Sequence, residues 1–215
     1  MSRILGWLAA LGLAAGLVMA FGVAPREATQ GNVQRIMYLH VPTVLVAYLA
    51  FVVVLVASIA YLWRRDPAAD RLAHASAEVG VLFTGLTIAA GAIWGKPTWG
   101  TWWTWDARLT SVAILFVMYL GYLLLRGMIE DRERGARYAA VVGIVAALDV
   151  PLVHFSVYWW RTLHQPPSLL KPGPASMPDG ILAALLVNVV SFALLYAYFV
   201  AKRVTILRRE GEVLA

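Results

Sequence analysis

The chain has 215 residues, of which 61% are hydrophobic and only 14% are charged, with a formal net charge of +6. A soluble domain is typically about half apolar and a quarter charged, so this composition predicts an integral membrane protein. The chain has no cysteine, which excludes a disulfide framework and a thiolate metal site. The basic residues lie beside apolar runs, so we interpret them as orientation signals and not as a nucleic-acid surface.

Six apolar runs follow one another along the chain, each about long enough to cross a bilayer as a helix. The first run has 21 residues and could be a retained helix or a cleavable signal peptide. A signal peptide has an apolar core of only about 7–15 residues, so we expect a retained helix. Pro42 fits the first turn of the second helix. Composition does not shift along the sequence, so we expect a single all-α membrane domain over residues 1–215, a bundle of six transmembrane helices. The expected spans are 4–24, 43–63, 78–95, 108–125, 138–158 and 180–201.

Basic residues are unevenly divided between the two sides that six spans create. The side of the termini holds twelve of them: Arg3, Arg64, Arg65, Arg71, Arg126, Arg132, Arg134, Arg137, Lys202, Arg203, Arg208 and Arg209. The opposite side holds six: Arg26, Arg35, Lys96, Arg108, Arg161 and Lys171. Because positive residues are retained inside, this asymmetry predicts that both termini are cytoplasmic.

The segment between the third and fourth spans is rich in tryptophan. Trp99, Trp102, Trp103 and Trp105 fall within seven residues, and Asp106 and Arg108 follow directly. An interfacial aromatic belt is one interpretation, but a belt needs only one or two tryptophans per helix end. Flat aromatic faces suit a flat, conjugated ligand, and an arginine suits acidic groups on the edge of that ligand. We therefore predict a ligand platform here. Asp106 has the alternative role of a helix cap, and Arg108 that of a headgroup contact.

Three motifs resemble a known family. The run WGKPTWGTWWTWDARLTS, residues 94–111, resembles the tryptophan-rich WWD signature of the haem-handling proteins of cytochrome c biogenesis. The runs YLHVP at 38–42 and WWRTLHQP at 159–166 are similar to the haem exporter protein C (CcmC) family within that group. The resemblance implies non-covalently bound haem b, presented at the periplasmic face of the bacterial inner membrane for attachment to the CcmE haem chaperone. It also implies three further partners: the CcmA ATPase, the CcmB membrane subunit and the small CcmD protein.

The four histidines differ in their expected position. His40, just before the second span, and His164, just after the fifth, share the outer side with the tryptophan segment. A neutral imidazole is a good iron ligand, and the resemblance implies that these two residues are the axial ligands of the haem iron. His74 lies on the inner side. His154 lies near the outer end of the fifth span, where we expect a hydrogen bond with Asp149 and keep the residue as a reserve ligand.

No nucleophile stands out, and Gly95-Lys96-Pro97 departs from the phosphate-loop pattern because proline replaces the hydroxyl residue. The sequence therefore predicts no catalytic or ATP site in this chain, and the resemblance implies that a partner hydrolyses ATP for haem release. Three alternatives stay open: a haem lyase-type enzyme, whose relatives are longer, a cytochrome b-like electron-transfer subunit, which calls for histidine pairs inside spans, and a structural subunit without ligand. The proline-rich run from Gln165 to Pro178 is expected to be a lid or a partner-contact loop.

Overall fold

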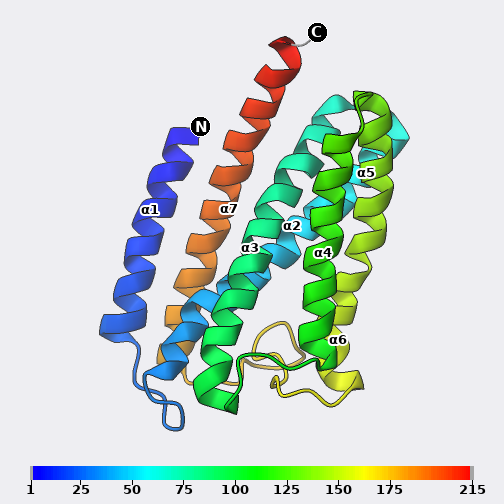
Figure 1. Cartoon of the computed structure of the whole chain (residues 1–215). Helices are drawn as coiled ribbons and strands as arrows, with labels where there is room; N and C mark the ends of the chain where they lie inside the picture. Colours follow the sequence, from blue (N-terminus) through cyan, green and yellow to red (C-terminus); the bar gives the residue numbers. More distant parts are fainter. Residues whose placement is uncertain (1, 214–215) are drawn as a thin grey trace.

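The computed structural model describes residues 2–213, and its regular elements are all helices (Figure 1). In chain order they are α1 (Ser2–Val18), η1 (Met19–Val23), η2 (Val33–Ile36), α2 (Met37–Arg64), α3 (Pro67–Trp99), α4 (Ala107–Met128), α5 (Arg132–Ala147), α6 (Asp149–Trp159) and α7 (Asp179–Val213). Six helical segments are long and apolar enough to cross a membrane, with α5 and α6 together forming the fifth. The prediction of a helical, multi-pass membrane protein with six spans is confirmed.

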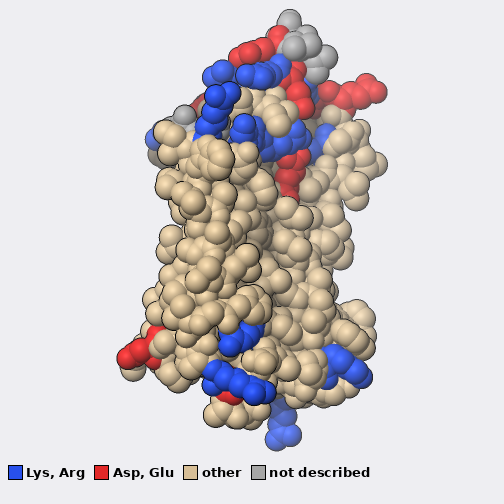
Figure 2. Space-filling model, turned by 90° about the vertical axis from the view of Figure 1, so that its left-hand side faces the viewer, with Lys and Arg blue, Asp and Glu red and all other residues tan. Residues whose placement is uncertain are grey.

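The helices form a bundle with two unlike ends. Both chain ends lie at one end, which we call the terminal end (Figure 1). The segments 24–32, 100–106 and 160–178 gather at the other, which we call the loop end. Charged side chains collect at the two ends and leave an uncharged band between them (Figure 2), as expected for a protein whose middle faces lipid.

The centre of the bundle is built on close contacts between α2 and its neighbours. The ring of Phe51 stacks on Tyr119 of α4 with centroids 3.7 Å apart, and the hydroxyl of Tyr119 donates to the carbonyl of Gly143 in α5 at 3.1 Å. Gly143 is a small residue of the kind that lets membrane helices approach one another closely. On the other flank α1 packs on α7, where Asn188 donates to the carbonyl of Gly16 at 3.1 Å.

Two helices begin earlier than the sequence pattern predicts. The third span begins at Pro67 and not near residue 78, because Asp66 accepts from the amide of Ala68 as an N-cap and Pro67 occupies the first turn. Its polar residues are also paired: Asp70 binds Arg126 at 2.6 Å, and Glu78 binds Arg203 at 2.8 Å.

The second helix also begins earlier, at Met37, directly after the 3-10 turn η2. Pro42 is consequently inside the helix and not in its first turn, and His40 lies on α2 and not in a loop before it. The expectation that His40 lies just before the second helix is therefore wrong.

The fifth span is broken at Leu148, between α5 and α6, where we expected a continuous helix. Pro151 lies just after the break and cannot donate a backbone hydrogen bond. The predicted bond between Asp149 and His154 is not formed. Among the described residues, Asp149 Oδ2 is buried and has no hydrogen-bond partner.

Candidate functional site

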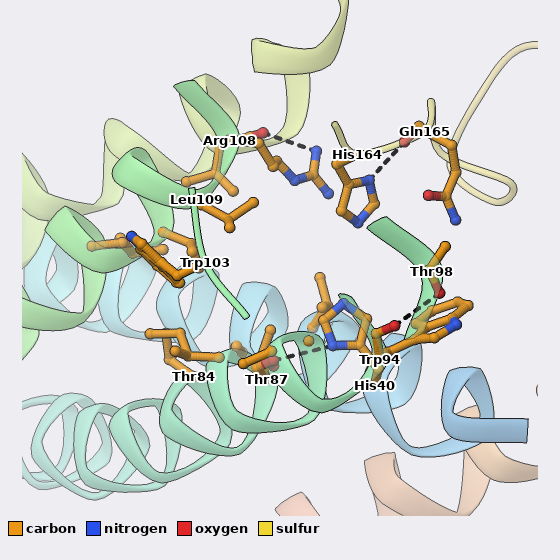
Figure 3. Close-up of a pocket in the computed structure, with 18 of the residues that line it drawn as sticks. His40, Thr84, Thr87, Trp94, Thr98, Trp103, Arg108, Leu109, His164 and Gln165 are labelled. Atoms are coloured by element: carbon orange, nitrogen blue, oxygen red, sulfur yellow. Dashed lines mark hydrogen bonds between the residues drawn. The ribbon is translucent and has the colours of Figure 1, made fainter. Parts of the chain in front are cut away.

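A pocket opens at the loop end, between the ends of α2, α3 and α4 and the segment 160–178. Two cavities, of about 840 and 650 Å³ including the space at their mouths, share His40, Arg108 and His164 among their lining residues. Their walls are mostly apolar and aromatic with a few polar groups, which is the usual lining of sites for small molecules and cofactors. Figure 3 shows His40 and His164 across the pocket from one another.

His40 is held against α3 by its ring. It lies on α2 with only 8% of its surface exposed, and its Nδ1 lies 3.1 Å from the carbonyl oxygen of Thr87. Because a carbonyl can only accept, Nδ1 carries the proton, and Nε2 keeps a free lone pair. The edge of Trp94 packs against the same ring, with centroids 5.8 Å apart.

His164 is held by its own loop. Its Nδ1 lies 2.7 Å from the carbonyl oxygen of Gln165, which again leaves Nε2 with the free lone pair. Trp99 packs beside the ring with centroids 5.9 Å apart. Burial, and after it the positive charge of Arg108, lowers the pKa of His164 to about 4, so the imidazole is neutral near pH 7.

The two imidazoles face each other across the pocket. Their centroids lie 6.4 Å apart and their planes differ by 36°. In Figure 3 the nitrogen of each ring that makes no hydrogen bond points into the space between the rings. Histidines that bind metals almost always donate their other ring N–H to a carbonyl or carboxylate, and both rings have that arrangement.

The structure divides the four tryptophans of the predicted platform into two pairs. Trp99, the last residue of α3, and Trp103 line the pocket. Trp102 and Trp105 are exposed, at 57% and 78%, and do not line it. Trp105 instead packs edge-on against Trp103, with ring centroids 5.5 Å apart. Among residues 2–213, the buried Nε1 of Trp103 has no hydrogen-bond partner.

Asp106 does not line the pocket and instead connects two segments of the loop end. One carboxylate oxygen accepts from the amide of Leu109 at 2.9 Å, so the predicted helix cap is confirmed. The other oxygen accepts from the amide of Leu163 at 3.0 Å, next to His164. The tryptophan segment and the His164 segment are therefore joined through one side chain.

Arg108 lines both cavities. Its guanidinium donates to the carbonyls of Val153 and His154 in α6, at 3.0 and 3.2 Å. These bonds use one terminal nitrogen, which holds the charge at the wall of the pocket (Figure 3). His154 itself lines only the smaller cavity and packs beside Tyr48, with ring centroids 6.3 Å apart.

Apart from Trp99, sequence reasoning missed the residues that α3 contributes to the site. Thr87, Gly91, Trp94 and Thr98 all line the pocket, and the spacing of four, three and four residues places them on one face of the helix. Trp94 also donates from Nε1 to the side chain of Gln30 at 2.8 Å. The spacing was visible in the sequence, but ending the third span at residue 95 hid it.

Comparison with known proteins gives consistent matches over most of the chain. The family model described as "Heme exporter protein C" matches residues 1–214. A protein of that name from Bradyrhizobium diazoefficiens is 44% identical over 214 residues, covering 97% of this chain and 81% of its own length. One from Haemophilus influenzae is 38% identical, covering 99% of this chain and 87% of its own length. One from Escherichia coli K12 is 39% identical over 153 residues, 71% of this chain and 62% of its own length. The chain belongs to the heme exporter protein C (CcmC) family.

Proposed function

We propose that the protein binds haem b without a covalent bond and presents it at the periplasmic face of the bacterial inner membrane. From there the haem is attached to the CcmE haem chaperone. In the same proposal the chain is a subunit of an ATP-driven haem-release complex with the CcmA ATPase, the CcmB membrane subunit and CcmD. Family membership and the names of the relatives, which describe heme export, support this role.

The observation that carries the proposal is the pair of free Nε2 atoms on His40 and His164. Histidine nitrogens bond first-row metal ions at about 2 Å, so two bonds on opposite sides of one ion, with half a ring at each end, span about 6 Å. The measured separation of the ring centroids is 6.4 Å. The donor set therefore fits an iron with two axial imidazoles, the arrangement of a low-spin haem.

The surroundings of the pair also fit a porphyrin. A flat ring placed between two axial imidazoles extends sideways on both sides of the line that joins them. The two cavities that share His40 and His164 are the openings into which such a ring would extend. Trp99 and Trp103 supply apolar contact, and Arg108 supplies the positive charge that propionates require. When bound, haem is the cargo, and the chain's own residues hold, orient and shield it.

The test is a matched set of histidine variants in purified protein loaded with haem. His40→Gly and His164→Gly should each convert a low-spin absorption spectrum into one with an open or water-filled position, and added imidazole should restore the original spectrum. His74→Gly is the control, because His74 lies near the terminal end and contacts Glu78 at 3.3 Å. An unchanged spectrum in either test variant removes that histidine from the site, and His154→Gly is then the next variant to examine.

A cytochrome b-like electron-transfer subunit is the second candidate, because His40 lies inside a membrane helix and not in a loop. A haem exporter passes its haem to a chaperone, whereas an electron carrier keeps it. Incubation of the haem-loaded protein with purified CcmE distinguishes the two. Haem recovered on CcmE supports export, and haem that stays with the chain through repeated reduction and oxidation supports electron transfer.

A further inference from the structure

The ring of His40 lies where only a glycine on α3 leaves it room. A Cβ built at Gly91 would lie 2.9 Å from Cε1 of His40 and 3.4 Å from its Nδ1. Carbon atoms do not approach one another that closely without displacement. Any side chain at position 91 would therefore push the imidazole of His40 away from α3.

The same missing side chain leaves a backbone carbonyl uncovered. In an α-helix the carbonyl of Thr87 accepts from the amide of Gly91, four residues later, and it has a second lone pair available. Side chains on a helix point back toward its N-terminus, so a Cβ at position 91 would lie over the turn that holds Thr87. Without that Cβ, the second lone pair of Thr87 accepts from Nδ1 of His40 at 3.1 Å.

Two threonines fix the register of α2 against α3. The hydroxyl of Thr87 donates to that of Thr43 at 3.0 Å, and the hydroxyl of Thr43 donates to the backbone carbonyl of His40 at 2.7 Å. Thr43 is fully buried and Thr87 is 6% exposed. Water therefore does not compete for these bonds, and the register of His40 against Gly91 is fixed by the pair.

We propose that Gly91 is a positioning residue, which holds the His40 ring against the Thr87 carbonyl and so keeps Nε2 open to the pocket. The assignment of His40 as an iron ligand rests on the proposed function. The hydrogen bond and the contact do not, and they can be tested in the protein without haem. Second-shell partners of this kind tune the affinity of a ligand histidine for its metal by about 10–100-fold.

The test uses Gly91→Ala, with Gly85→Ala as the matched control on the same helix. A Cβ at position 85 would meet Phe116 of α4 at 3.5 Å, an ordinary contact. In histidine-labelled protein without haem, NMR should show a slowly exchanging Nδ1 proton for His40 in the parent chain and in Gly85→Ala. Gly91→Ala should lose that signal. Its haem dissociation constant should rise at least about tenfold, while that of Gly85→Ala stays unchanged.

A double-mutant cycle excludes a general folding defect. If the methyl group acts through His40, Gly91→Ala should lower the thermal unfolding temperature in the parent chain but not in a His40→Gly background. Equal losses in both backgrounds, or a retained Nδ1 signal in Gly91→Ala, would overturn the proposal. If the parent chain binds no haem, while Gly91→Ala still loses the Nδ1 signal and lowers the unfolding temperature only when His40 is present, the proposed function is overturned and the positioning role is supported.

Discussion

Replacing Asp106 with asparagine tests whether the tryptophan segment and the His164 segment act as one unit. Asparagine is as good an N-cap as aspartate, so the bond to the amide of Leu109 is kept. The second carboxylate oxygen becomes an amide N–H₂, which places a donor opposite the donor of Leu163. Asp106→Asn therefore removes the connection between the two segments and leaves the start of α4 unchanged.

The size of the effect follows from the bond that is lost. A hydrogen bond to a charged group contributes about 1.5–3 kcal/mol, and exposure of the Leu163 amide reduces this to about 1 kcal/mol. If the whole loss of about 1 kcal/mol falls on the haem-bound state, haem binds about fivefold more weakly, and this is the largest effect expected. Titration of haem into the variant in detergent, followed by absorption, measures this ratio directly.

Asp131→Asn is the control, because Asp131 caps α5 by the same spacing, accepting from the amide of Arg134 at 2.9 Å, and lies at the terminal end. Its haem affinity should equal that of the parent chain. Parent-like affinity in Asp106→Asn, or an equal loss in Asp131→Asn, would refute the reasoning. The first result would show that the two segments are independent, and the second that the loss arises from general destabilisation.

Three further predictions concern charge, aromatic contact and topology. In Arg108→Gln the pKa of His164 should rise from about 4, but only part of the way toward 6.5, because burial is the larger cause of the shift and remains; NMR without haem measures the rise. Between about pH 4 and 6.5 the unfolded parent chain binds a proton at His164 and the folded chain does not. The free energy of unfolding of the parent chain should therefore fall as the pH drops through that window, and the fall should be smaller in the variant. Trp103→Ala should weaken haem binding by about 1 kcal/mol or more, and Trp102→Ala should leave it unchanged; equal losses would contradict the division of the platform. A reporter inserted at Lys171 should lie on the opposite side of the membrane from one at the C-terminus.

Much of the fold follows from local pattern, but the ends of the helices do not. Six runs of about twenty apolar residues predict six spans, because each run suffices to cross a bilayer. The polar beginning of α3 was missed because its carboxylates are satisfied by Arg126 and Arg203, which lie on other helices. Such pairing between distant residues cannot be recognised in a local window. Asp66 followed by Pro67 was the one local sign of the true start.

The candidate site, too, could be predicted only in part from the sequence. Both histidines and Arg108 were proposed from residue type, from the predicted side of the membrane and, for the histidines, from the family resemblance, and all three line the pocket. The separation of Trp103 from Trp102 was not, because residues 100–106 have no regular helix or strand whose period assigns a face. The contact between His40 and Gly91 depends on the register of two helices, which the apolar pattern leaves undetermined.

The helix α3 connects the ion pairs of the terminal end with the pocket of the loop end. It has 33 residues and is therefore about 50 Å long. Asp70 and Glu78 join its first half to α4 and α7, and Trp94 and Trp99 lie at its other end beside the two histidines. A tilt of α3 by about 2° about its first residues moves its far end by nearly 2 Å, about the length of one bond between a histidine and a metal ion. A small displacement at the ion pairs of the terminal end is therefore enough to separate the walls of the pocket at the loop end.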